Sequence, residues 1–214
     1  MLKNITMFLA GKKWAYWSLI LLLAFFSYLM LEITLQYVPM RFDVAFLKIK
    51  QSQVQLPFYR VAFYVHVYTS MLALLAGFTQ FNKKFRSNSS VHRNVGKLYV
   101  AVILGLSGPS GFIMALFANG GFSSQIGFSL LAIFWMTSTL QAFRSAKNKD
   151  FIQHRNWMIL SYALTLSAVT LRLWKMGIVW AFQPPPMDAY RIVAWLGWVP
   201  NLLVAFLLWK KKPF

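Results

Sequence analysis

Six long apolar stretches, separated by short polar loops, divide the chain. A helix needs about 20 apolar residues to cross the hydrocarbon core of a bilayer, and each stretch is of that order. We therefore predict an all-α fold, a transmembrane bundle of six helices in which spans two to five form the core of a single integral membrane domain over residues 1–214. The first stretch is too long for a signal-peptide core, so we expect it to be retained. The predicted spans are residues 14–38, 58–81, 98–118, 126–143, 157–182 and 189–209.

The charges of the chain lie mainly in the loops and termini. There are 22 Lys and Arg against 4 Asp and Glu, a formal net charge of +18. With six spans, most of the basic residues fall on one side, and the positive-inside rule then places both termini in the cytoplasm. This pattern indicates a multi-pass protein beside anionic lipids rather than a nucleic-acid-binding protein. The residues on that side are Lys3, Lys12, Lys13, Lys83, Lys84, Arg86, Arg93, Lys97, Arg144, Lys147, Lys149, Arg155, Lys210, Lys211 and Lys212.

The loop at 39–57 is the only one long enough for structure of its own. Its apolar residues recur at helical spacing beside Lys48 and Lys50, which predicts a short amphipathic helix lying on the outer surface. These apolar residues are Phe42, Ala45, Phe46 and Ile49.

The composition excludes several kinds of site. The chain has no cysteine, so disulfides, thiolate zinc sites, c-type haem attachment and cysteine nucleophiles are ruled out. Four acidic residues are too few for a dinuclear carboxylate site.

Two tripeptides occur twice in the same order. FRS stands at 85–87 and 143–145, and HRN follows at 92–94 and 154–156. Each pair lies in a short basic loop between two apolar stretches, which indicates a duplicated hairpin related by an axis along the membrane normal. That axis predicts equivalent positions for His92 and His154 at the cytoplasmic edge.

The segments HRNVGKLYV from His92 and HRNWMILSYALTLSAVTLR from His154 resemble a family of predicted bacterial integral membrane proteins of unknown function. The resemblance covers about half of the chain, from His66 to Arg172, and implies the inner (cytoplasmic) membrane of a bacterium but no chemistry. A more distant likeness is to b-type cytochromes of the bis-histidine four-helix class. The chain has three histidines rather than four, so this likeness implies one haem at most.

The HRN pair leaves three alternatives open. His92 and His154 could ligate the iron of one haem b, with Arg93 and Arg155 binding the propionates. They could instead form an anion site for lipid headgroups or another substrate, or serve as interfacial anchors. If the helices begin only at the apolar stretches, both histidines sit at headgroup depth. A cap at Ser89 or Ser90 would bring His92 into the first turn of a helix.

Three ionisable residues fall inside predicted spans, in one layer near the outer end. From the helical rise, His66 lies about 12 Å deep, Arg172 about 15 Å and Glu32 about 9 Å. We expect Glu32 to face Arg172 in an ion pair, with His66 lining an adjoining outer polar pocket. The layer is then either a structural ion pair or a site for a quinone headgroup or small substrate, where His66 handles a proton.

These features support three functional hypotheses. The first is a membrane redox protein with haem or quinone at a histidine site. The second is a non-enzymatic membrane subunit or lipid-binding scaffold, with other membrane subunits as partners. The third is a small transporter or sensor with an outward-facing pocket. No catalytic set stands out, so the sequence leaves open whether the protein is an enzyme.

Overall fold

The computed structural model of the protein describes residues 13–81 and 87–209, and this part of the chain contains helices and no strand. The all-α prediction is confirmed. The elements are α2 (Lys13–Leu35), η1 (Ala45–Ile49), α3 (Gln51–Val54), α4 (Pro57–Phe81), α6 (Ser89–Val102), η2 (Ile103–Ser107), α7 (Gly108–Leu116), α8 (Phe122–Lys147), α9 (Phe151–Thr165), α10 (Ser167–Phe182), α11 (Pro186–Leu196) and α12 (Val199–Leu207).

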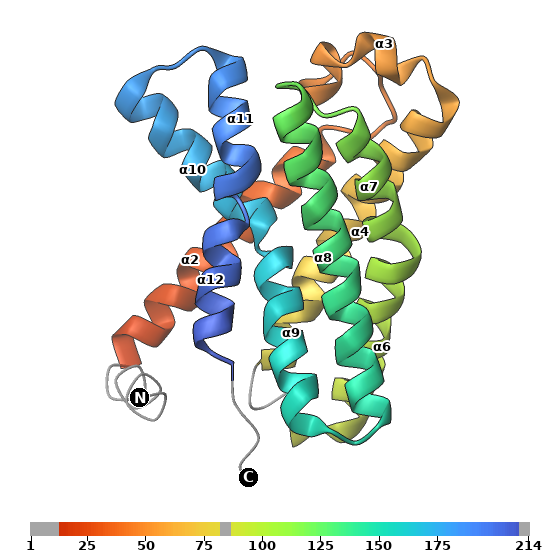
Figure 1. Cartoon of the computed structure of the whole chain (residues 1–214), viewed down its shortest axis with the longest axis vertical. Coiled ribbons are helices and arrows are strands. Elements are labelled where there is room, and N and C mark those ends of the chain that lie inside the picture. The colour runs from red at the N-terminus through yellow and green to blue at the C-terminus, as the bar shows by residue number, and fades with distance from the viewer. Residues whose placement is uncertain (1–12, 82–86, 210–214) are drawn as a thin grey trace.

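The helices run up and down between two ends of the bundle (Figure 1). We call one the α3 end, which holds η1, α3 and the α10–α11 turn. The other is the basic end, which holds the α8–α9 turn and the start of α6. Within the described residues, four helical units are long and apolar enough to cross a membrane, and there are five if the bent pair α9–α10 forms one span. The predicted first span is helical from Lys13 to Leu35.

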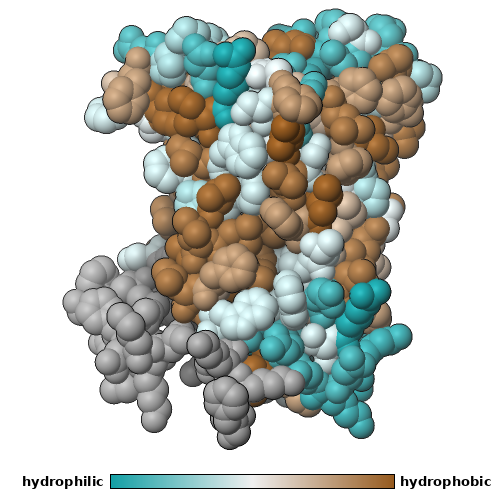
Figure 2. Space-filling view, viewed as in Figure 1, coloured by the Kyte–Doolittle hydropathy of each residue, from teal (hydrophilic) through white to brown (hydrophobic). Residues whose placement is uncertain are grey.

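An apolar belt surrounds the middle of the bundle. Figure 2 shows hydrophobic residues over the central part of the visible face and hydrophilic residues gathered toward both ends. Large apolar side chains are exposed on helices facing outward, among them Leu72, Leu75 and Trp180. Such a belt has no favourable contact with water, so lipid covers it.

Two helices begin earlier than the apolar pattern predicts. α6 starts at Ser89, nine residues before the predicted Leu98, because the Asn88 side chain accepts a hydrogen bond from the Val91 N–H. α9 starts at Phe151 rather than Trp157, because the Asp150 side chain accepts from the Gln153 N–H. These N-caps satisfy amide groups that the helix itself leaves free. Polar caps, rather than hydrophobicity, therefore set both helix starts.

The predicted span 157–182 is broken. α9 and α10 meet at Leu166 and are bent by 42°. Asn201 of α12 inserts its side-chain amide there, donating to the Ala163 carbonyl at 3.0 Å and to the Thr170 hydroxyl at 2.9 Å. A side chain that enters the backbone ladder is an established cause of a kink. The bend redirects α10 away from the bundle axis (Figure 1).

The third span contains a π-helical turn, η2, in front of Pro109. Proline has no N–H to donate, so the preceding turn cannot keep a regular α-helical ladder. Glycine allows two close approaches just beyond this turn. A Cβ on Gly108 would lie 2.4 Å from Met136 of α8, and one on Gly111 would lie 2.8 Å from the His66 ring of α4.

The segment between α2 and α4 differs from its prediction as a surface helix. It forms two short helices, η1 and α3, and the buried residues of these helices and of the junction between them are Leu47, Lys50 and Val54. Ile49, predicted to lie on the apolar face, is 58% exposed. The tighter 3₁₀ turn changes the period of the segment, which is why α-helical spacing selects the wrong face.

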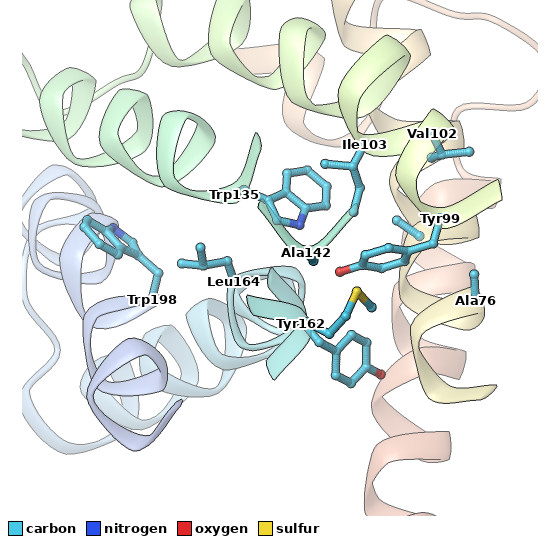
Figure 3. Close-up of a cluster of buried hydrophobic side chains, with 11 residues drawn as sticks. Ala76, Tyr99, Val102, Ile103, Trp135, Ala142, Tyr162, Leu164 and Trp198 are labelled. Atoms are coloured by element: carbon cyan, nitrogen blue, oxygen red, sulfur yellow. The ribbon is translucent and has the colours of Figure 1, made fainter. Parts of the chain in front are cut away.

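A hydrogen-bonded group of hydroxyls lies within the main core. The Tyr99 hydroxyl of α6 lies 2.8 Å from those of both Ser161 and Thr165 on α9. On α8, Thr139 lies 2.7 Å from Ser161, and the Trp135 indole N–H donates to Thr165. Figure 3 shows Tyr99 and Trp135 directed toward the same part of the core. These contacts fix the register of α6, α8 and α9, because buried hydroxyls are costly to leave unpaired.

Candidate functional site

A cavity of about 550 Å³ opens within the half of the bundle nearer the α3 end. It is bounded by α2, α4, α7, α8, the α9–α10 bend and α11. Lys50, which lies between η1 and α3, also lines it. On α4 its lining extends from Tyr59 to Leu74, fifteen residues apart and so about 22 Å along the helix. The volume lies in the range of sites that hold one small organic molecule. The cavity is therefore both large enough and long enough for an extended ligand.

His66 lines this cavity and has a fixed orientation. Its Nδ1–H donates to the Ser107 carbonyl at 2.8 Å; the tautomer follows because a carbonyl can only accept. The Ser107 hydroxyl in turn bonds Thr69 at 2.7 Å, so the π-helical turn and α4 are tied together. Gly111 leaves room for the imidazole. This arrangement leaves Nε2 as the nitrogen able to accept a hydrogen bond from a ligand.

Arg172 also lines the cavity, but the expected ion pair with Glu32 is absent, and that prediction is wrong. The Arg172 guanidinium donates to the Ala168 carbonyl at 2.6 Å, within its own helix. Glu32 is exposed on α2, where its carboxylate accepts from the Tyr28 hydroxyl at 2.6 Å, and it does not line the cavity. The depths of the two residues match, but α2 is rotated so that Glu32 points away from the bundle.

Lys50 is a further charged residue on the cavity wall. Its side chain is 1% exposed, and its ammonium group donates to the Phe117 carbonyl and lies 5.8 Å from the centre of the Phe46 ring. Burial lowers the pKa of Lys50 to about 8, because the charged form loses hydration there. Lys175 of α10 completes the basic lining nearer the surface.

The lowered pKa of Lys50 predicts a pH-dependent stability. Between about pH 8 and the ordinary lysine value of 10.5, the unfolded chain binds this proton and the folded chain does not. Unfolding then takes up a proton, so the stability of the ligand-free protein rises as the pH rises through this window. Lys50→Met should remove this component. Thermal melts at pH 7.5 and pH 10 measure it, and an unchanged difference in Tm between the two pH values in Lys50→Met would contradict it.

The two HRN segments occupy equivalent positions at the basic end. In each, the backbone N–H of the histidine donates to the carbonyl of the capping residue, His92 to Asn88 at 3.0 Å and His154 to Asp150 at 2.9 Å. His92 precedes Tyr99 by seven residues, and His154 precedes Ser161 by seven residues. The hydroxyls of Tyr99 and Ser161 are hydrogen-bonded to each other. Because α6 and α9 run in the same direction (Figure 1), the histidines lie at similar levels.

The side chains of the two segments have different surroundings. His154 donates from Nδ1 to the Ala142 carbonyl of α8 at 2.9 Å, and His92 is partly buried in the first turn of α6. Arg93 is exposed and donates to the Ser89 carbonyl, whereas Arg155 is partly buried. Neither histidine lines the cavity described above. In the first FRS copy, Phe85 and Arg86 lie outside the described residues, as do Lys3, Lys12 and Lys210–Lys212.

Lys50 and Gly111 are site residues that the sequence interpretation did not identify. The spacing of the 39–57 loop placed Lys50 on a polar face, and no local signal marks it as buried. Gly111 belongs to a group of closely spaced residues in the third span, Gly105, Gly108, Pro109 and Gly111, and small residues of this kind indicate close helix packing. Only the structure shows that its neighbour is His66.

Comparison with known proteins yields one match. A family model described as "Predicted membrane protein (DUF2306)" matches residues 63–209, more than two thirds of the chain. It covers His66, Gly111, Arg172 and both HRN segments, but not α2 or Lys50. Neither the curated proteins nor the solved structures contain a match to this chain.

Proposed function

The chain belongs to the DUF2306 family of predicted membrane proteins, and we propose that this member binds one amphipathic small molecule in the cavity described above. The observation that carries this proposal is the composition of the cavity wall. Apolar side chains such as Met30, Met71 and Leu74 line one part, and polar groups, His66 and Arg172 among them, line another. Ligand sites in proteins commonly combine an apolar wall with a few polar groups that orient the ligand.

Lys50 and His66 lie nearer the α3 end than the apolar residue Leu74, which gives the bound molecule a direction. Lys50 lies in the loop at the α3 end, and His66 lies nine residues into α4 from Pro57. Leu74 lies eight residues further, about 12 Å deeper by the helical rise. A headgroup therefore sits toward the α3 end, and its hydrocarbon part extends toward the middle of the bundle. A quinone with a hydrocarbon tail and a fatty acid both have this shape.

The experiment that tests the proposal measures binding of radiolabelled palmitate and of decylubiquinone to purified protein in neutral detergent. Saturable binding of at least one probe is expected. Ala132→Phe places a ring in the cavity, since Ala132 is buried on its wall. We expect this variant to raise Kd about tenfold or more, which corresponds to about 1.4 kcal/mol.

Ile133→Phe is the matched control, because the adjacent Ile133 side chain is exposed on the lipid side of α8. It should leave Kd unchanged. Absence of saturable binding of either probe to the unmodified protein, or equal loss of binding in both variants, would refute the proposal.

The charges of the basic end support one orientation of the protein in the membrane. Arg93, Lys97, Arg144, Lys147 and Lys149 gather there on exposed positions, and short loops rich in Lys and Arg remain in the cytoplasm. The α3 end and the cavity headgroup site then face outward from the inner membrane, and both termini are cytoplasmic. A reporter that is active only in the cytoplasm should be active when it is fused after Phe214. Activity of a reporter that works only in the periplasm, fused at the same position, would show that the orientation is the opposite one.

Ligation of one haem b by His92 and His154 is the second candidate function. The equal sequence spacing of the two histidines from the Tyr99–Ser161 hydrogen bond supports this function. The hydrogen bond from His154 Nδ1 to the Ala142 carbonyl also supports it, because it directs Nε2 away from Ala142 and leaves that nitrogen for a metal. An absorption spectrum of protein reconstituted with haemin tests this function. A Soret shift that is lost in His154→Ala is expected, and the spectrum of free haemin would eliminate haem as a cofactor.

A further inference from the structure

The cavity wall carries positive charge without any acidic residue. Its described lining includes Lys50, Arg172 and Lys175, together with the His66 imidazole, and contains no Asp or Glu. These groups belong to one connected region. Arg172 lies within electrostatic range of Tyr37, whose hydroxyl accepts from the Phe46 N–H, and the Phe46 ring lies beneath the Lys50 ammonium group.

No Asp or Glu side chain is available to neutralise this region, because the chain has only four acidic residues and all four are among the described residues. Each has another position and another partner. Glu32 accepts from Tyr28, Asp43 pairs with Arg41, Asp150 caps α9, and Asp188 pairs with Arg191. Cations in a region of low dielectric are costly unless an anion compensates them. Arg172 and Lys50 therefore have no acidic partner within the described residues, and an anionic ligand from outside the chain would supply one.

The cationic groups have donors to offer. Within the described residues, Arg172 makes one hydrogen bond, to Ala168, and a guanidinium has five N–H donors. Lys50 likewise makes one hydrogen bond, to Phe117, and an ammonium group has three donors. Arginine binds carboxylate and phosphate oxygens as a planar fork, and such charge-assisted bonds are among the strongest in proteins.

We infer that the ligand of this cavity is a single-chain amphiphile whose headgroup is an oxyanion, a carboxylate or a phosphate. This inference rests on the proposed function and adds the charge of the headgroup. Arg172 and Lys50 bind the oxyanion, and the hydrocarbon chain lies along Met30, Met71 and Leu74. An uncompensated positive wall distinguishes such a ligand from a neutral one of equal length, because only the anion offsets the desolvated charges.

The test compares three ligands with the same 16-carbon chain: palmitate, hexadecyl phosphate and hexadecanol. Binding is measured to the full chain in neutral detergent at pH 7. We expect palmitate, hexadecyl phosphate or both to bind at least about tenfold more tightly than hexadecanol, as charge-assisted hydrogen bonds imply. The tighter of the two anions identifies the headgroup.

Arg172→Met and Lys50→Met should reduce this preference. Lys48→Met should keep it, because Lys48 is exposed on η1, two residues before Lys50. A folded-state readout accompanies the binding data. Removing an uncompensated cation should raise the Tm of the ligand-free Arg172→Met variant above that of the unmodified protein. With a Tm that is raised or unchanged, a loss of anion binding in this variant is not due to unfolding. If hexadecanol binds as tightly as both anions, the headgroup inference is overturned while the proposed function stands. If none of the three ligands binds, the headgroup inference fails; the proposed function fails with it only if decylubiquinone does not bind either.

Discussion

Replacing Gly77 by alanine is expected to lower the free energy of unfolding by about 3 kcal/mol, the upper range for overpacking a core. Gly77 of α4 lies directly against the ring of Tyr162 on α9, and an added Cβ would lie only 2.1 Å from a ring carbon. Tyr162 is buried and packs edge-on against Phe78, so its ring has little freedom to move. The two helices must separate instead, which weakens the core on both sides of the contact.

Gly177→Ala provides the matched control for this substitution. Gly177 is also helical, but a Cβ there meets no atom within 4 Å. Alanine is a better helix former than glycine, so this variant should be unchanged or slightly more stable. Thermal melts in detergent compare the two variants. Equal Tm values for Gly77→Ala and the unmodified protein would show that α4 and α9 do not approach each other as described.

Replacing Gly111 by alanine is expected to affect both stability and ligand binding. The new Cβ would lie 2.8 Å from Nδ1 and Cε1 of His66. The imidazole must then move, and its bond to the Ser107 carbonyl breaks. Leaving these buried groups unpaired costs about 1–3 kcal/mol. Because His66 lines the cavity, the affinity for a bound amphiphile should also fall.

Gly105→Ala tests whether this effect is specific to the histidine. Gly105 belongs to the same span, yet its Cβ would project into open space. We expect normal binding and near-normal stability for that variant. Binding titrations and melts on both variants check the prediction, and unchanged affinity in Gly111→Ala would mean that the position of His66 does not matter to the ligand.

The number and order of the helices follow from hydropathy, because long apolar stretches have few other stable arrangements in a bilayer. Hydropathy predicts the ends of the helices less well than their number and order. Asn88 and Asp150 extend α6 and α9 into basic, polar sequence through capping bonds. The break at Leu166 is also invisible in the sequence, since residues 157–182 form one apolar run without proline. Its cause is Asn201, which lies 35 residues further along the chain.

The candidate site illustrates a second limit. Depth in the membrane can be estimated from residue counts, and His66 and Arg172 do line one cavity. Rotation about a helix axis cannot be estimated when apolar residues surround the helix, as they do on α2. Glu32 therefore matched Arg172 in depth but faces away from it, beside Tyr28. An amphipathic helix would have revealed its inner face.

Burial of Lys50 depends on contacts that are distant in sequence. Its partner Phe117 is 67 residues away, at the end of α7. The small number of acidic residues does indicate that some basic residues lack an acidic partner, because 4 Asp and Glu cannot pair with 22 Lys and Arg. From the sequence alone, that imbalance indicates only the orientation in the membrane. The structure adds that part of the excess charge lines a cavity.

The most direct test of the central claim is photo-crosslinking with palmitate and hexadecanol that each carry a diazirine near the end of the chain. Leu74 is 2% exposed and lines the cavity, whereas its neighbours Leu72 and Leu75 are 47% and 50% exposed to lipid. If the cavity holds the chain, at least one probe should label Met71 or Leu74, and excess unlabelled ligand should prevent that labelling. Labelling confined to Leu72 and Leu75, and unaffected by the competitor, would contradict the account.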